Sequence, residues 1–155
     1  MSKQITTEQV KELRDATGIS VMQCRQALEE AGGDKEKALV ILKKAGSELA
    51  LKKADRVLGS GYIEAYVHGE GRIGAMVELQ CETDFVAKNK VFRTLAREIA
   101  LQVAATAPAD ETALLQESYI KNPETTVAQL IEEAIQKTGE RIKIGRLARF
   151  ELPQK

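Results

Sequence analysis

The amino-acid sequence predicts an α+β fold, in which a module of three N-terminal helices precedes a three-stranded antiparallel sheet packed with helices. Capping residues and glycines divide residues 1–46 into three short amphipathic segments, which predicts the helices. Apolar residues alternate with polar ones on both sides of a glycine-rich turn, a pattern typical of a β-hairpin. A third alternating segment ends the chain, after two stretches with the apolar spacing of helices.

Each N-terminal helix is predicted from a residue whose side chain can cap its first turn. Thr6 and Gln9 form a capping-box pattern before the first helix, and Ser20 precedes the second. Asp34 precedes the third helix, which we expect to end at Gly46 because glycine favours helix ends. Three such short helices bury a very small core, so the module needs close packing or a partner to be stable.

The expected elements divide the 155 residues into three parts. Residues 1–46 are expected to form the helical module, and residues 47–58 a polar helix that links this module to the rest. Residues 59–155 are expected to form an α+β core domain. The total length is enough for one domain or two very small ones.

The strands of the core are predicted from alternation with a period of two. Apolar residues occupy the odd positions of residues 62–68 and 72–81, which flank the turn Gly69-Glu70-Gly71. The third strand, within residues 142–152, carries its apolar residues on even positions. The opposite face of the sheet is also partly apolar, which is typical of a face that a partner covers. Its apolar residues are Tyr62, Tyr66, Met76 and Leu147.

Two helices are expected to back the sheet. The second begins at Thr125 or Thr126 and ends at Gly139. The first ends before Pro108 and carries an apolar stripe with the periodicity of a helix buried on one side. This stripe consists of Phe92, Leu95, Ala96, Ile99 and Val103.

Phe85 lies where the second strand gives way to the first of these helices. Only 4% of the chain is aromatic, so the position of each ring is informative. A continuous helix from Asp84 would place Phe85 seven residues before Phe92, on the buried stripe. A helix that breaks at Lys88 and restarts at Asn89, a good capping residue, would allow the ring to face solvent. The physics of the sequence leaves both arrangements open.

Composition argues against several classes of function. Lys plus Arg and Asp plus Glu each number 23, and this balance disfavours a broad electrostatic surface for nucleic acid or membrane. No cysteine or histidine spacing is typical of a metal site, and no cofactor is expected. Two isolated cysteines and the lack of a long apolar run favour a reducing, cytosolic compartment. Cys81 and His68 are the candidates for a nucleophile–base pair, but Cys81 is expected to face the core, where a thiol is inert.

Three blocks of sequence are informative through their order and spacing. They are Val10–Arg14 with Thr17-Gly18, Met22, Ala27-Leu28 and Gly33-Asp34; Cys81–Asn89; and Gly139-Glu140-x-Ile142 through Phe150–Leu152. The first block is similar to a three-helix module of the ubiquitin-associated type, and the second contains a complete Thr-Asp-Phe-Val signature. Together the blocks cover nearly the whole chain and resemble the elongation factor Ts family.

This resemblance implies that the chain is not an enzyme but a guanine nucleotide exchange factor for the translational GTPase elongation factor Tu. In the family an Asp-Phe pair enters the GTPase near its Mg²⁺ and nucleotide, which gives this role to Asp84 and Phe85. Thr83 and Val86 are then expected to fix the loop. The N-terminal module is expected to contact the nucleotide-binding domain of the GTPase. The candidate contact residues are Lys11, Arg14, Val21 and Met22.

The resemblance also implies an oligomeric state. Longer members carry a second sheet-bearing subdomain and a helical hairpin, for which residues 106–126 are too short. Short relatives dimerise through their sheets, which implies a non-covalent homodimer that covers the face bearing Tyr62 and Met76. No nucleic acid or membrane partner is expected, and the place of action is the cytoplasm or an organellar matrix. The alternative is a stand-alone three-helix interaction module, for which substitution of Phe85 would have no effect.

Overall fold

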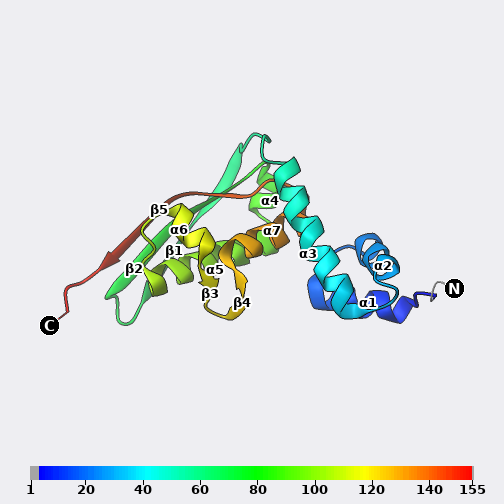
Figure 1. Cartoon of the computed structure of the whole chain (residues 1–155). Helices are drawn as coiled ribbons and strands as arrows, with labels where there is room; N and C mark the ends of the chain where they lie inside the picture. Colours follow the sequence, from blue (N-terminus) through cyan, green and yellow to red (C-terminus); the bar gives the residue numbers. More distant parts are fainter. Residues whose placement is uncertain (1–3, 155) are drawn as a thin grey trace.

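The computed structural model describes residues 4–154 and has the predicted α+β architecture. Figure 1 shows α1 and α2 at one end of an elongated molecule and the three long strands at the other, with α3 between them. The elements are α1 (Thr7–Thr17), α2 (Val21–Glu30), α3 (Lys35–Lys52), β1 (Ser60–His68), β2 (Ile73–Cys81), α4 (Asp84–Ala87), α5 (Lys90–Thr106), α6 (Glu111–Gln116), β3 (Ser118–Tyr119), β4 (Asn122–Thr126), α7 (Val127–Thr138) and β5 (Lys143–Glu151). In this part of the chain, no helix combines the length and apolar composition needed to cross a membrane.

The N-terminal helices begin where the capping residues predict. The Thr6 side chain accepts a hydrogen bond from the backbone N–H of Gln9, and the Gln9 side chain accepts one from the Thr6 N–H, which completes a capping box. The Asp34 side chain caps α3 by accepting a hydrogen bond from the backbone N–H of Lys37. The three helices enclose a small apolar cluster, in which Leu13 and Leu28 are almost completely buried.

The predicted end of the third helix at Gly46 is wrong, because α3 continues without interruption to Lys52. Gly46 is buried where α3 packs against α7. A Cβ atom at this position would lie 2.9 Å from Oε1 of Gln136 on α7. The glycine therefore permits a close approach of two helices rather than ending one of them.

The three long strands form an antiparallel sheet in the order β1-β2-β5. Its inner face packs against α5, and Figure 1 shows α5, α6 and α7 on the same side of the sheet. All five residues of the predicted stripe on α5 are buried there. The α7 helix begins at a Thr126 capping box and ends at Gly139, as predicted. The larger core of the molecule lies between this sheet and α5 and α7.

The predicted assignment of β1 to the two faces of the sheet is wrong. The loop between β1 and β2 has four residues, Gly69–Arg72, so even positions of β1 pair with odd positions of β2. Tyr62 pairs with Leu79 and Tyr66 with Ala75, and both tyrosine rings therefore pack on the inner face against the core. A three-residue turn, as predicted, would have placed them on the outer face.

The predicted face of Leu147 is also wrong, because β5 contains a bulge. Val77 pairs with Leu147 and Leu79 with Ile144, so β5 carries one extra residue between these two pairs. Beyond the bulge, odd positions of β5 face inward, and Leu147 packs against the core. Of the four residues predicted on the outer face, only Met76 lies there, with its side chain 49% exposed.

A second, two-stranded sheet of β3 and β4 was not predicted from the sequence. Its strands are short and show no apolar alternation, and Asn122-Pro123 was expected to be a simple break. The hairpin is held instead by Gln102, a fully buried side chain of α5. Gln102 donates hydrogen bonds to Glu117 and to the carbonyl of Ser118, and accepts one from the N–H of Ile120.

Candidate functional site

The most exposed apolar side chain at the junction of strand and helix is the ring of Phe85. This ring is 82% exposed, although the next two residues of α4, Val86 and Ala87, are only 3% and 5% exposed. The short helix thus presents one large ring to solvent while Val86 and Ala87 anchor it in the core. An exposed aromatic side chain on an anchored element is typical of a contact site for a partner.

The helix breaks between α4 and α5, as the second of the two predicted arrangements requires. Asn89 caps α5, and its side chain accepts a hydrogen bond from the N–H of Val91 at 2.8 Å. Arg93 Nε donates a hydrogen bond to the carbonyl of Ala87 at 2.6 Å, which fixes the C-terminal end of α4. The break separates Phe85 from the phase of Phe92, which is fully buried.

The N-terminal end of α4 is fixed by Thr83 and Asp84. The Thr83 hydroxyl oxygen accepts a long hydrogen bond from the N–H of Val86, at 3.4 Å, and so caps the helix. The Ser60 hydroxyl at the start of β1 donates to Oδ1 of Asp84 at 2.5 Å. One carboxylate oxygen of Asp84 is therefore occupied within the molecule, while the residue remains exposed.

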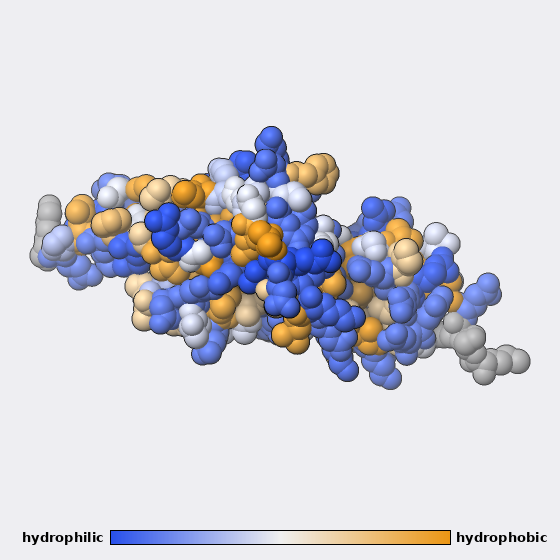
Figure 2. Space-filling view, turned by 90° about the horizontal axis from the view of Figure 1, so that it is seen from above, coloured by the Kyte–Doolittle hydropathy of each residue, from blue (hydrophilic) through white to orange (hydrophobic). Residues whose placement is uncertain are grey.

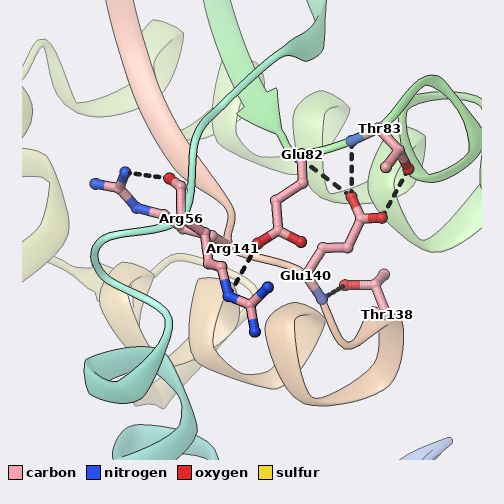
Figure 3. A network of polar contacts seen from close by, with 6 residues as sticks. All are labelled: Arg56, Glu82, Thr83, Thr138, Glu140 and Arg141. Atoms are coloured by element: carbon pink, nitrogen blue, oxygen red, sulfur yellow. Dashed lines mark hydrogen bonds and ion pairs between the residues drawn. The ribbon is translucent and has the colours of Figure 1, made fainter.

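Glu140 is a residue of the site to which the sequence assigned no role. Its Oε1 accepts hydrogen bonds from the N–H groups of Glu82 and Thr83, at 3.1 and 3.0 Å. Its Oε2 accepts a hydrogen bond from the Thr83 hydroxyl at 2.6 Å. Figure 3 shows this side chain reaching from the end of α7 to the loop before α4. The only sequence signal was that Glu140 follows the helix-ending Gly139 in a block with family resemblance.

Arg56 and Arg141 connect the segment between α3 and β1 to the loop before α4. Arg141 Nη1 donates to the carbonyl of Arg56, in the connection between α3 and β1. Arg56 Nε lies 4.0 Å from Oε1 of Glu82, a buried oxygen that accepts no hydrogen bond within the described residues. The positive charge of Arg56 is the feature that offsets the burial of this oxygen.

The geometry does not support a nucleophile–base pair of Cys81 and His68. Cys81 pairs with Ser60 and His68 with Ile73, so the two residues lie at opposite ends of the hairpin. Burial raises the pKa of the Cys81 thiol, and the neighbouring carboxylates, Glu140 foremost, raise it further. A buried thiol with a raised pKa is unreactive. Within residues 4–154, no group of acidic, histidine or cysteine side chains could hold a metal ion.

The candidate residues of the N-terminal module form a separate group. Lys11, Arg14, Val21 and Met22 are exposed, and the Met22 side chain is 77% accessible to solvent. They lie on α1 and α2, which Figure 1 shows at the end of α3 away from the sheet and α4. The structure therefore does not bring these residues together with Phe85.

The outer face of the main sheet is a second candidate surface. Figure 2 views the molecule from above and shows apolar atoms interspersed among polar ones over the region of the strands. A shallow hollow of about 300 Å³ lies between Ile63, Met76 and Ala148, beside an ion pair of Glu78 and Arg146. The large apolar side chains exposed on this face are Ile63, Val67, Met76 and Phe150.

Comparison with known proteins places these features in one family. A family model described as "Elongation factor TS" matches residues 82–155. The elongation factor Ts of Carboxydothermus hydrogenoformans is 42% identical over 96% of this chain and 89% of its own length. That of Caldanaerobacter subterraneus is 40% identical over 95% of this chain and 96% of its own length. That of Heliobacterium modesticaldum is 38% identical over 96% of this chain and 90% of its own length.

The alignment with the Carboxydothermus protein extends over 193 residues, more than the 155 of this chain, so the relative contains residues that have no counterpart here. The similarity nevertheless covers both the helical module and the sheet with its Thr-Asp-Phe-Val loop. On this identity and coverage, the chain belongs to the elongation factor Ts family.

Proposed function

We propose that the chain is a guanine nucleotide exchange factor for elongation factor Tu, and that Asp84 and Phe85 enter this GTPase near its Mg²⁺ and nucleotide. The observation that carries the proposal is the ring of Phe85, 82% exposed on a helix of four residues that is fixed at both ends. Membership of the elongation factor Ts family supports the identity of the partner.

The proposed mechanism is a displacement of the surroundings of the metal ion. Mg²⁺ demands nearly ideal octahedral geometry, so a small shift of its ligands weakens the binding of GDP substantially. A ring held on an anchored helix can impose such a shift, because little conformational entropy is lost when it enters the partner. Asp84 would hydrogen-bond to the partner through its remaining oxygen, while Thr83 and Val86 hold the loop.

Exchange of this kind needs no covalent step and no cofactor in the chain itself. A factor that binds the nucleotide-free GTPase more tightly than the GDP-bound form must weaken GDP binding by the same ratio. The direction of exchange then follows from the excess of GTP in the cytoplasm or organellar matrix, the proposed place of action. The chain would accelerate nucleotide exchange without changing the final ratio of bound GDP to bound GTP.

We further propose that residues 1–46 form a domain that contacts the nucleotide-binding domain of the GTPase, with residues 47–58 as its link to residues 59–155. The exposure of Val21 and Met22, at 47% and 77%, supports a contact role, because neither side chain is used to pack the module. Lys11 and Arg14 are exposed on the preceding helix and add positive charge to the same module.

The experiment that tests the main proposal is the release of labelled GDP from elongation factor Tu, with and without the chain. The wild-type chain should accelerate release, and Phe85→Ala should lose most of the acceleration while remaining folded. Leu51→Ala removes a side chain of similar exposure, 78%, from α3 and serves as the matched control. Full activity of Phe85→Ala would contradict the role of the ring. No acceleration by the wild type would contradict exchange itself and favour an interaction module.

We also propose that the outer face of the main sheet forms a non-covalent homodimer. The support is the set of large apolar side chains exposed on this face, Ile63, Val67, Met76 and Phe150, since an exposed group of apolar side chains with a polar surround is typical of a protein interface. Sedimentation equilibrium at tens of micromolar should show a dimer. Met76→Arg should abolish it, because a charge would be buried in the interface. Met22→Arg is the control, since it places the same charge on α2. A wild-type chain that is purely monomeric would contradict the proposal.

A further inference from the structure

We propose that Glu140 is a positioning residue that sets the direction in which Phe85 projects. This inference rests on the exchange function proposed above and assigns a role in it to a residue outside the Thr-Asp-Phe-Val run. Glu140 lies 57 positions along the chain from Thr83, at the end of a different helix. It contacts the loop that leads into α4, and not the exposed ring itself.

The direction of the ring depends on the two residues between β2 and α4. The α4 helix has a single turn, Asp84–Ala87, and cannot hold its own orientation through internal hydrogen bonds. The burial of Val86 and Ala87 holds one side of the helix in the core, and the backbone of Glu82 and Thr83 sets the direction in which the chain enters it. Both N–H groups of this segment donate to one carboxylate oxygen of Glu140, at 3.1 and 3.0 Å. A charged acceptor shared by two successive donors fixes the conformation of the segment strongly.

The second oxygen of Glu140 also determines how Thr83 caps the helix. The Thr83 hydroxyl donates its hydrogen to Oε2 of Glu140 at 2.6 Å. Its lone pairs are then free to accept from the N–H of Val86, the capping bond of α4. An amide at position 140 would present one oxygen acceptor and one NH₂ donor to this segment, in place of two oxygen acceptors. Glu140→Gln should thus preserve the bonds to the backbone and weaken the cap.

Glu140 is itself held by the end of α7. The hydroxyl of Thr138 accepts from the N–H of Glu140 at 3.4 Å and donates to the carbonyl of Ala134 at 2.8 Å. Gly139 adopts the left-handed conformation that ends the helix and turns the chain toward the loop. The carboxylate is therefore presented from a long helix packed in the larger core. Through the hydrogen bonds of Glu140, the rigid end of α7 therefore restricts the motion of the one-turn helix that carries Phe85.

The first test measures amide hydrogen exchange at Glu82 and Thr83 in the free chain, without the GTPase. Amide hydrogen exchange followed by NMR should show exchange at Glu82 and Thr83 rising about tenfold or more in Glu140→Ala, because both lose a charged acceptor. Glu133→Ala is the matched control, a glutamate of α7 with no side-chain hydrogen bond among the described residues. The amides of α5 should exchange at the same rate in all three proteins, which excludes general loss of stability.

The second test separates positioning from simple loss of contact in GDP release from elongation factor Tu. Glu140→Ala should lower the maximal rate at saturating concentration by about tenfold, since every side chain that meets the partner remains and only its direction is loosened. The concentration that gives half-maximal acceleration should change much less. Glu140→Gln should give an intermediate maximal rate, and Glu133→Ala the rate of the wild type.

The outcomes distinguish failure of this inference from failure of the exchange function. If the wild-type chain, in which Glu140 is present, does not accelerate GDP release, the exchange function itself is contradicted. Slow exchange at Glu82 and Thr83 in a folded Glu140→Ala chain overturns the role of Glu140 in holding the loop. Faster hydrogen exchange with an unchanged maximal rate of GDP release overturns its role in positioning Phe85. Should Glu140→Ala not fold, Glu140→Gln decides the question through the same two measurements.

Discussion

The N-terminal module and the sheet-bearing part of the chain are stabilised by different kinds of contact. In the described residues, the buried cluster of the module contains eight residues, whereas that of the sheet and its helices contains twenty. Polar side-chain contacts within the module join residues that are close in sequence, such as Thr6 with Gln9 and Thr17 with Cys24. In the sheet-bearing part, similar contacts join distant residues, such as Glu140 with Thr83 and Arg149 with Ala104.

This difference explains where the candidate site lies. In the proposed mechanism, the ring displaces groups in a partner and needs a rigid support, and contacts between distant segments provide one. Phe85 is placed on the larger core, next to three such contacts from Glu140. The module, with its small core, instead exposes Val21 and Met22 on a compact local fold. In the proposed complex, the module would add affinity, whereas the ring of Phe85 would displace groups in the partner.

The largest expected effect contrasts two phenylalanines of the sheet-bearing part. Phe92→Ala should lower the free energy of unfolding by about 3–5 kcal/mol, because its ring is fully buried in the core. Phe85→Ala should change it by less than about 0.5 kcal/mol, because its ring is in solvent. Urea denaturation of the two variants measures the difference. Comparable losses for both would mean that Phe85 packs inside the molecule in solution.

A second prediction tests whether the module unfolds on its own. Leu28→Ala removes a buried side chain from the small cluster and should destabilise the module by about 2–5 kcal/mol. Amide exchange should then accelerate in α1 and α2 and stay slow in α5, since α5 belongs to the other cluster. Arg25→Ala, an exposed position of the same helix, is the control. Equal acceleration in α5 would mean that both parts unfold together.

The helices of both regions could be predicted from the sequence because their signals are local. Capping residues such as Thr6 and Asn89 act within one turn, and the stripe through Phe92 and Ile99 reports burial directly. The family could also be inferred, since the Thr-Asp-Phe-Val run is contiguous. The sequence leaves the position of Phe85 open, because the choice between a continuous and a broken helix depends on how Val86 and Ala87 pack in the core.

Features that depend on pairing or on distant contacts could not be predicted. One additional unpaired residue in the β1–β2 loop reversed the faces of Tyr62 and Tyr66. A bulge in β5 reversed the face of Leu147. Gly46 is of the residue type that often ends a helix, but here it lies inside α3 and permits the close approach of α7. Glu140 accepts hydrogen bonds from the N–H groups of residues 82–83, and no periodicity or spacing in the sequence relates these positions.

A third prediction concerns the contact between α3 and α7, which connects the two regions. Gly46→Leu should destabilise the protein by about 1–3 kcal/mol, because Gly46 is buried between α3 and α7, where a Cβ atom would already lie 2.9 Å from Oε1 of Gln136 and 3.6 Å from the carbonyl of Glu132, and the rest of a leucine side chain has no space. Ala45→Leu, on the exposed side of the same helix, should have little effect. Thermal unfolding of the two variants checks this. If Gly46→Leu were as stable as the control, the close approach of the helices would not contribute to stability.

The smallest expected effect is a dependence of stability on pH at the β3–β4 hairpin. Glu98 on α5 accepts hydrogen bonds from the Tyr119 hydroxyl at 2.6 Å and from Lys121 at 2.8 Å. Burial raises the pKa of Glu98, but these two bonds and the charges of Lys121 and Arg97 lower it more, so the net shift is downward. A carboxyl whose pKa is lowered on folding stabilises the protein above its unfolded pKa, and this stabilisation is lost as the pH falls through the folded value.

Glu98→Gln should therefore be less stable than the wild type by about 0.5–1 kcal/mol at neutral pH, and the difference should shrink below about pH 4. Urea denaturation of both proteins across this range measures it. Glu124→Gln, an exposed position of β4, should match the wild type at every pH. A difference that persists unchanged in acid would assign the stabilisation to the shape of the side chain, and not to its charge. In that case the hairpin would depend on packing and neutral hydrogen bonds.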